Sequence, residues 1–298
     1  MTLTQFNSII EIRTKIISMG TFITGSIYAL TLGNWSWQTF IIMGSAVLCV
    51  DMATTGFNSY YDYLNGTDNR TYNRERDKVL VHDGVSPQTA LSVSLALSAA
   101  AAVLGIILAY RTSWLLIPAG GICMIAGYAY TGGPWPISRT PLGDLAAGGF
   151  LGTALFMISV AVMTGEVTLD ALAASLPLFC MIALILMVNN TCDIEGDTAA
   201  GRKTLEILIG KKRSIHLMGA LGLGAYASAF ALSLAGIYPF PVVPLLVLSL
   251  AFSAHTALAM KSRGFTMETK GPSIRGISRI FLTLVFALSC GMLISLLI

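Results

Sequence analysis

Two groups of acidic and amide side chains stand out, because each follows a long apolar stretch and repeats the same spacing. The first lies in NSYYDYLNGTDN at 58–69, where Asn58 and Asp62 are four residues apart. The second is NNTCDIEGD at 189–197, which repeats the four-residue step twice. Side chains four residues apart share one face of a helix. We therefore expect each group to present its oxygen atoms together, as two halves of one site.

A helix-ending signal follows the first group. Asn65-Gly66 is typical of such an end, because glycine readily adopts the left-handed conformation that a C-cap requires. Asp68 is therefore expected just beyond the helix, folded back toward Asp62.

The chemistry of the two groups indicates a hard metal ion. They offer carboxylate and amide oxygens, and neither a histidine nor a CxxC pair accompanies them. Such donors favour magnesium over zinc. Their four aspartates carry a charge of −4, which two magnesium ions would cancel. The candidate metal ligands are Asn58, Asp62, Asp68, Asn189, Asn190, Asp193 and Asp197.

Basic residues beside the two groups indicate a phosphate-bearing substrate. Magnesium in proteins is commonly shared between a few carboxylates and substrate phosphates. The candidate diphosphate contacts are Arg70, Arg74, Lys78 and Lys203. A diphosphate held at the mouth of an apolar helix bundle implies a lipid tail that reaches into the bilayer. Because bound magnesium assists the departure of diphosphate, the pattern indicates transfer of a prenyl group.

The rival hypothesis from another class is a cation transporter. Transporters place broken helices and ion-binding carboxylates near the membrane midplane. Here the carboxylates lie at one end of the apolar stretches, and their basic neighbours suit a diphosphate. The sequence therefore favours the enzyme.

Composition shows what must hold these groups in place. The 298-residue chain is 55% hydrophobic and 11% charged, with a mean hydropathy of +0.74, whereas soluble domains average about 25% charged residues. A membrane-spanning helix needs about 20 mostly apolar residues. We predict an all-α, polytopic membrane protein forming a single domain over 1–298, with nine transmembrane helices in a bundle. The predicted helices are 14–33, 37–60, 88–110, 113–131, 143–163, 170–190, 214–236, 240–260 and 277–298.

The order of these helices indicates an internal repeat and an orientation. Two four-helix pseudo-repeats, roughly 14–131 and 143–260, each carry one acidic group after their second helix, and a ninth helix is added. On this topology 17 of the 18 lysines and arginines lie on one side, with Arg111 alone on the other. By the positive-inside rule, we predict a plasma-membrane protein whose N-terminus and acidic groups face the cytoplasm and whose C-terminus lies outside.

Four sequence segments resemble the UbiA superfamily of intramembrane aromatic prenyltransferases. The resemblance extends through most of 20–215 and is specific in the Tyr-Thr-Gly-Gly-Pro turn and in the second acidic group. The segments are NSYYDYLNGTDN at 58–69, KVLVHDGVSPQTAL at 78–91, YTGGPWPISRTPLGDL at 130–145 and NNTCDIEGDTAAGRKTL at 189–205. This resemblance implies nine helices and two aspartate-rich motifs that hold two Mg²⁺ ions and the diphosphate.

The resemblance also implies a particular reaction. Within the superfamily the chain is most similar to the branch that joins a polyprenyl diphosphate to 1,4-dihydroxy-2-naphthoate, with decarboxylation, in menaquinone biosynthesis. The product would be a demethylmenaquinone. The alternatives are prenylation of another aromatic acid, or terpenoid cyclisation by the same ionisation. The implied partners are these substrates and the lipid bilayer, and no nucleic acid.

Two positions depart from the superfamily pattern. Ser59 stands where an aspartate usually follows the first asparagine, and Cys192 stands where the branch carries an arginine. One expected ligand and one expected cation are thus replaced.

The predicted catalytic residues are Asp62, Asp193, Asp51 and Tyr130. Asp51 shares a helix face with Asp62, and an unpaired carboxylate at that depth costs about 2.5–3.5 kcal/mol. We expect it to have a partner or to be protonated, and its role as base, ligand or interhelical contact stays open. Tyr130 is placed by its motif to shield a carbocation. Asp144 is interpreted as a loop residue.

Overall fold

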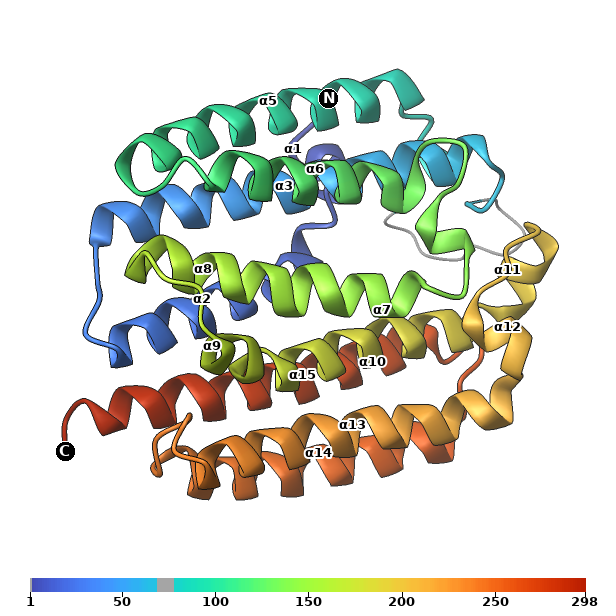
Figure 1. The fold of residues 1–298 in the computed structure, drawn as a ribbon. Helices are drawn as coiled ribbons and strands as arrows, with labels where there is room; N and C mark the ends of the chain where they lie inside the picture. The colour runs from blue at the N-terminus through green and yellow to red at the C-terminus, as the bar shows by residue number, and fades with distance from the viewer. Residues whose placement is uncertain (1, 69–77) are drawn as a thin grey trace.

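The computed structural model describes residues 2–68 and 78–298, and the regular structure of these two ranges is entirely helical (Figure 1). The helices run along one another in a bundle. Their bounds are α1 Leu3–Ile9, η1 Ile12–Lys15, α2 Ile16–Thr31, α3 Trp37–Leu64, α4 Val79–His82, α5 Pro87–Arg111, α6 Leu116–Thr131, η2 Ile137–Arg139, α7 Gly143–Ala147, the π-helical η3 Gly148–Ala154, α8 Leu155–Thr164, α9 Leu169–Ala174, α10 Leu176–Cys192, α11 Ile194–Ala199, α12 Leu205–Ile209, α13 Lys211–Leu234, α14 Val242–Arg263 and α15 Lys270–Ser295.

Every predicted apolar stretch is helical in the structure. The fifth is a continuous helix made of α7, η3 and α8, and the sixth is divided into α9 and α10 at Ser175. Among the described residues, seven helices are long and apolar enough to cross a membrane, whereas α6 has only 16 residues. The prediction of an all-helical membrane protein is confirmed, and the number of nine crossings stays a prediction.

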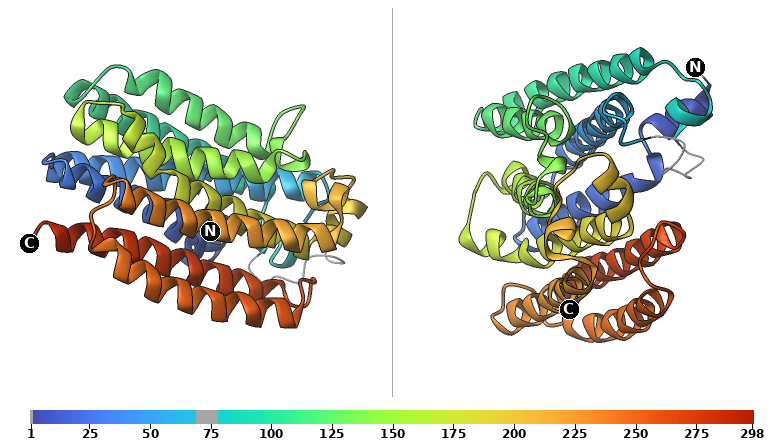
Figure 2. Two further views of the ribbon diagram at one scale, coloured as in Figure 1. Left: turned by 60° about the horizontal axis from the view of Figure 1, so that its bottom comes forward. Right: turned by 90° about the vertical axis from the view of Figure 1, so that its right-hand side faces the viewer.

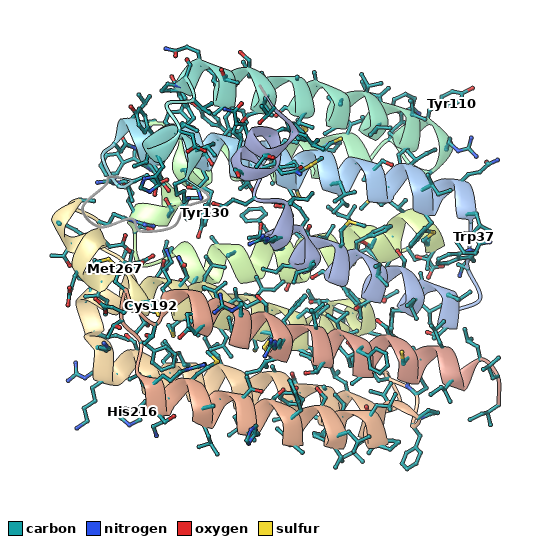
Figure 3. The ribbon with its side chains drawn as sticks, turned by 180° about the vertical axis from the view of Figure 1, so that it is seen from behind. Trp37, Tyr110, Tyr130, Cys192, His216 and Met267 are labelled. Atoms are coloured by element: carbon teal, nitrogen blue, oxygen red, sulfur yellow. The ribbon has the colours of Figure 1, made fainter. Side chains whose placement is uncertain are left out.

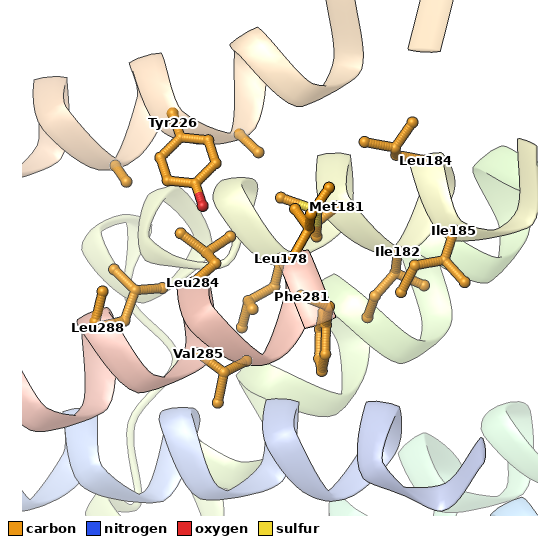
Figure 4. Packing of buried hydrophobic residues seen from close by; sticks show 14 of the residues in the cluster. Leu178, Met181, Ile182, Leu184, Ile185, Tyr226, Phe281, Leu284, Val285 and Leu288 are labelled. Atoms are coloured by element: carbon orange, nitrogen blue, oxygen red, sulfur yellow. The ribbon is translucent and has the colours of Figure 1, made fainter. Parts of the chain in front are cut away.

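The core of the protein surrounds α10. This helix is apolar on all sides and packs against α7, η3, α13 and α15, as expected for a helix without a polar face. Leu178, Met181 and Ile182 are completely buried, and Phe281 of α15 packs into the same cluster (Figure 4). The second acidic group therefore extends from the most firmly packed helix of the bundle.

The first acidic group ends a helix of the other half of the bundle. This helix, α3, packs along α5 and α6, and α2 contacts α3, α8 and α15. The two peripheral helices α5 and α14 lie at opposite edges of the bundle (Figure 2). The pairs α3–α5 and α10–α13 occupy corresponding places in the two halves of the sequence. The pseudo-repeat and the single domain stay predictions.

Small residues allow η3 to pack closely against α10. At Gly152, an added Cβ would lie 2.7 Å from the Phe179 Cα, too close for any real contact. At Gly149, in the same π-helical segment, an added Cβ would meet nothing within 4 Å. Close backbone approach at small residues is a common means of helix association in membranes.

We predict that Gly152→Ala destabilises the protein and that Gly149→Ala does not. The added methyl at 152 must push η3 away from α10, and overpacking of this kind costs about 1–3 kcal/mol. Thermal unfolding of the detergent-solubilised variants measures the difference. Equal melting temperatures for the two variants would contradict this account of the η3–α10 contact.

Candidate active site

The end of α3 places the first acidic group. Asn65 caps the helix, Gly66 follows in the left-handed conformation with φ +69°, and the chain reverses there. The backbone N–H of Asp68 then donates to the Asp62 carbonyl oxygen at 3.0 Å. The predicted return of Asp68 toward Asp62 is confirmed.

The second acidic group spans a helix break. α10 ends at Cys192, Asp193 is the capping residue, and α11 begins at Ile194. The Asp197 N–H donates to the Asp193 carbonyl oxygen at 2.8 Å. Asn190 and Asp197 are both buried, so this polar group turns inward rather than toward solvent.

The two groups meet at one end of the bundle. The charges of Asp68 in the first group and Asp197 in the second both act on Asp62, as do those of Lys78 and Arg202, which follow the two groups. Figure 3 shows Tyr130 and Cys192 at this end, and Trp37 and Tyr110 at the opposite end. The prediction that two distant halves form one site agrees with this arrangement.

The short helix η2 connects the two acidic groups. The Arg139 guanidinium donates to Thr67 Oγ1 at 3.4 Å and to the Ala200 carbonyl oxygen at 2.5 Å. The Arg202 guanidinium donates to the Ser138 carbonyl oxygen at 2.6 Å. The end of the first group and the loop after the second are therefore joined through Ser138 and Arg139.

Three aspartates in the site are each paired with a basic side chain. Lys78 Nζ lies 3.3 Å from Asp68 Oδ2, and Lys270 Nζ lies 2.8 Å from Asp193 Oδ2. Lys78 also contacts Glu11 Oε1 at 2.9 Å. The third pair joins Arg202 Nη1 to Asp197 Oδ1 at 2.9 Å. Basic groups thus balance the charges of Asp68, Asp193 and Asp197.

Burial and charge shift two pKa values in the second group. Burial raises the pKa of Asp197 to about 6, and the Arg202 charge opposes the rise. Burial alone would lower the pKa of Arg202, but the charges of Asp197 and Asp62 outweigh it and raise that pKa. Arg202 therefore stays positively charged inside the site, which suits contact with an anion.

The structure places the other predicted site residues as follows. Asn58 and Asn189 are half-buried on the last turns of α3 and α10. The Lys203 side chain is exposed, whereas its neighbour Arg202 points into the site. Arg70 and Arg74 lie outside the described residues.

Asp51 has partners for both of its carboxylate oxygens. Lys15 Nζ lies 2.6 Å from Asp51 Oδ1, and Ser18 Oγ donates to Asp51 Oδ2 at 2.5 Å. Lys15 also donates to Thr55. The expectation that Asp51 has a partner is confirmed, and the contact joins α2 and η1 to α3. A catalytic role for Asp51 stays a prediction.

Tyr130 lies among the charged groups of the site. The charges of Asp144, Arg202 and Asp62 all act on its hydroxyl. Its motif therefore brings an aromatic ring to the acidic end of the bundle.

Several site residues were not foreseen from the sequence. The interpretation of Asp144 as a loop residue was wrong: it is buried in the first turn of α7 and accepts a 2.7 Å hydrogen bond from Asn190 Nδ2. The Glu206 carboxyl, completely buried in α12, acts electrostatically on Asp144. Arg139 and Lys270 were also missed. An acidic residue opening an apolar helix was the available signal for Asp144, whereas nothing local marks Lys270.

The two departures from the superfamily pattern have structural explanations. Ser59 is buried and donates to the Ile9 carbonyl oxygen at 3.1 Å, which anchors the chain after α1 to α3. Cys192 is buried beside Asp193, and the Lys270 charge acts on it. Lys270 therefore supplies, from α15, a positive charge where the resemblance leads us to expect one from position 192.

The donor atoms fit a hard cation, although the ligands are not yet gathered around one point. The ligand set consists of oxygens, and Asp197 Oδ2 is buried without a hydrogen-bond partner. Within 2–68 and 78–298, no three histidine, cysteine or acidic side chains converge as a metal site. Asp197 Oδ2 is open to an ion as it stands, whereas the oxygens paired with Lys78, Arg202 or Lys270 would exchange that partner for it.

The fold and the comparisons with known proteins together define a membrane-embedded prenyltransferase. The pattern of the UbiA prenyltransferase family matches residues 18–264, and the chain belongs to this family. It is 34% identical over 212 residues to a 1,4-dihydroxy-2-naphthoate octaprenyltransferase of Bacillus subtilis (strain 168), an alignment that covers 71% of this chain and 68% of that protein. A Mycobacterium tuberculosis protein with the same name is 29% identical over 232 residues, covering 78% and 77%.

Solved structures share the fold. A UbiA homolog from Archaeoglobus fulgidus bound to GPP and Mg²⁺ superposes with a TM-score of 0.68 at 16% identity, covering 97% of this chain and 99% of that one. A structure of digeranylgeranylglyceryl phosphate synthase gives a TM-score of 0.67 at 17% identity, covering 97% and 98%. At these identities the likeness concerns the fold alone.

We predict that Lys270→Met lowers the rate of prenyl transfer about 10–100-fold, as expected when a group that holds a ligand is removed. Adding Cys192→Arg should recover part of the loss, because it returns a positive charge beside Asp193. Steady-state rates of the two single variants and the double variant measure the coupling. Lys261→Met, at an exposed lysine near the end of α14, is the matched control. A double variant no faster than Lys270→Met would contradict the assigned role of Lys270.

Proposed function

We propose that the protein transfers a polyprenyl group from its diphosphate to 1,4-dihydroxy-2-naphthoate, with decarboxylation, giving a demethylmenaquinone for menaquinone biosynthesis. The similarity to the Bacillus subtilis octaprenyltransferase of this acceptor carries the proposal. The meeting of the two aspartate-rich groups beside Arg202 and Lys78 supports it, because this end of the bundle offers both carboxylates and cations to a charged head group.

We infer that the reaction depends on Mg²⁺, with two ions expected. The oxygen donors of Asp62, Asp68, Asp193 and Asp197 and the partnerless Asp197 Oδ2 support this, and a structural homolog binds GPP with Mg²⁺. When bound, the ions would neutralise charge on the departing diphosphate. The remaining ligands of the proposed set are Asn58, Asn189 and Asn190.

The basic residues of the site have a second role in this proposal. Lys78, Arg202 and Lys270 pair with aspartates in the structure, so a cation that takes those oxygens frees their charges for the diphosphate. Arg70, Arg74 and Lys203 stay proposed diphosphate contacts. Asp62 and Asp193 are the proposed catalytic aspartates.

The proposed bond changes are balanced. The ring carbon of the acceptor that carries the carboxylate attacks the first carbon of the prenyl chain as the bond from that carbon to the diphosphate oxygen breaks. The carboxylate then leaves as carbon dioxide, and its electron pair restores the aromatic ring. Tyr130, among the charges of the site, is proposed to face the allylic carbon and to stabilise its developing positive charge.

Mixing purified protein, Mg²⁺, a labelled polyprenyl diphosphate and 1,4-dihydroxy-2-naphthoate labelled in its carboxylate should yield a prenylated product and labelled carbon dioxide in equal amounts. Parallel reactions with 4-hydroxybenzoate test the alternative acceptor. An enzyme that prenylates 4-hydroxybenzoate and ignores the naphthoate would refute the acceptor and retain the prenyltransferase. A cyclised terpenoid made without any acceptor would favour the cyclase alternative.

In the same assay, Asp62→Asn and Asp193→Asn should each lower the rate at least about 10²–10³-fold, the usual cost of removing a transition-state charge interaction. Asp83→Asn, at an exposed aspartate after α4, should leave the rate unchanged. Near-normal turnover by either variant would refute the catalytic role proposed for that aspartate.

We also propose that the protein lies in the plasma membrane with the acidic end of the bundle in the cytoplasm and the C-terminus outside, because the basic residues gather at that end. In a cysteine-free background, Lys212→Cys should react with reagents on the cytoplasmic side. Phe240→Cys, exposed in the connection between α13 and α14, should react from the opposite side. Labelling of both positions from one side would reject this topology.

A further inference from the structure

A groove of about 420 Å³ lies between α14 and α15, on a different pair of helices from the aspartate-rich groups. Its lining includes three arginines and one histidine. Arg275 and Arg279 are one turn apart on α15, and they face Arg263 and His255 of the antiparallel α14. Ala259 and Gly276 also line the groove, and Gly276 lets α15 pack closely on Met260 of α14.

The arginines of this groove have no acidic partner in the protein. Within the part of the chain that the structure describes, Arg263, Arg275 and Arg279 form no ion pair with a carboxylate. The groove lining contains no acidic residue, and Glu268 of the connecting loop is not part of it. The groove is therefore strongly positive and lacks an internal counter-charge.

The position of the groove along α15 indicates the depth at which an anion would sit. The 26 residues of α15 extend about 39 Å, which exceeds the hydrocarbon thickness of about 30 Å. Arg275 and Arg279 lie about 8 and 14 Å from the first residue of the helix. They therefore fall near the lipid head groups and the adjoining edge of the hydrocarbon, where long basic side chains reach the interface and can meet a lipid phosphate.

The deep end of the groove is apolar. Phe252 of α14 lines this end and is 43% exposed. Exposed apolar residues continue both helix faces beyond it. Leu248 lies one turn from Phe252 on α14, and Phe286 lies two turns from Arg279 on α15. The groove thus passes from a basic end to an apolar end along the direction of the membrane normal. That order matches a lipid with an anionic head group.

We propose that this groove binds one anionic phospholipid from the leaflet at the basic end of the bundle. The phosphate contacts Arg263, Arg275 and Arg279, and the acyl chains follow Phe252 and Phe286. Basic pockets between transmembrane helices are suited to anionic lipid head groups, and planar guanidinium groups bind phosphate oxygens in pairs. A free phosphate would use the same arginines but would gain nothing from the apolar end.

Native mass spectrometry of the full-length protein in detergent, titrated with dioleoyl phosphatidylglycerol, tests the proposal. We expect one lipid to be retained at low concentration, and phosphatidylcholine to bind at least ten times more weakly. Arg275→Gln/Arg279→Gln should weaken phosphatidylglycerol binding roughly 30-fold, a factor of about five for each basic side chain. Lys212→Gln/Arg213→Gln removes two exposed charges from the same end of the bundle and should change binding less than twofold.

Three results would overturn the proposal. They are equal binding of the two lipids, an equal loss in the Lys212/Arg213 control, and displacement of the lipid by equimolar inorganic phosphate. Melting temperature in detergent establishes that each variant is folded. If the double variant does not fold, Arg275→Gln alone should still lower affinity about fivefold, and unchanged affinity would count against the proposal.

Discussion

The need to balance buried carboxylates governs the acidic end of this bundle. In surroundings of low dielectric an unpaired charge is expensive, and an ion pair is tolerated only where its geometry is good. The chain meets this condition with four basic partners: Lys15 for Asp51, Lys78 for Asp68, Arg202 for Asp197 and Lys270 for Asp193. The pairs of Lys15, Lys78 and Lys270 therefore also fix one segment against another, whereas Arg202 and Asp197 are five residues apart. The charge balance and the shape of the site are set by the same contacts.

Apolar packing provides the frame in which those contacts form. α10 is buried among four other elements, and its last residues carry the second acidic group directly out of the core. η2 then joins the loops that follow the two groups through Arg139. A rigid helix on one side and a shared guanidinium on the other hold two segments together that are far apart in the sequence. This division between apolar frame and polar end suits a substrate with a lipid tail and a charged head.

Local features were predictable from the sequence, and long-range contacts were not. Helices follow from apolar stretches of sufficient length, and the return of Asp68 follows from Asn65-Gly66. Whether Arg202 or Lys203 points into the site depends on the backbone path after α11. There the Arg202 N–H donates to the Asp197 carbonyl oxygen. No periodic pattern encodes that path. Lys270 and Asp144 reach the site only because α15 and α7 pack beside α10, which spacing along the chain does not reveal.

The pair formed by Lys15 and Asp51 limits how the sequence can change over time. Loss of either partner alone leaves an uncompensated charge inside the bundle, at a cost of about 3–5 kcal/mol, whereas replacement of both by apolar residues is often neutral. Any evolutionary route away from this pair therefore passes through a poorly folding intermediate, unless both codons change almost together. Although Lys15 and Asp51 lie on different helices, selection acts on them as a pair, and substitutions at the two positions should be correlated.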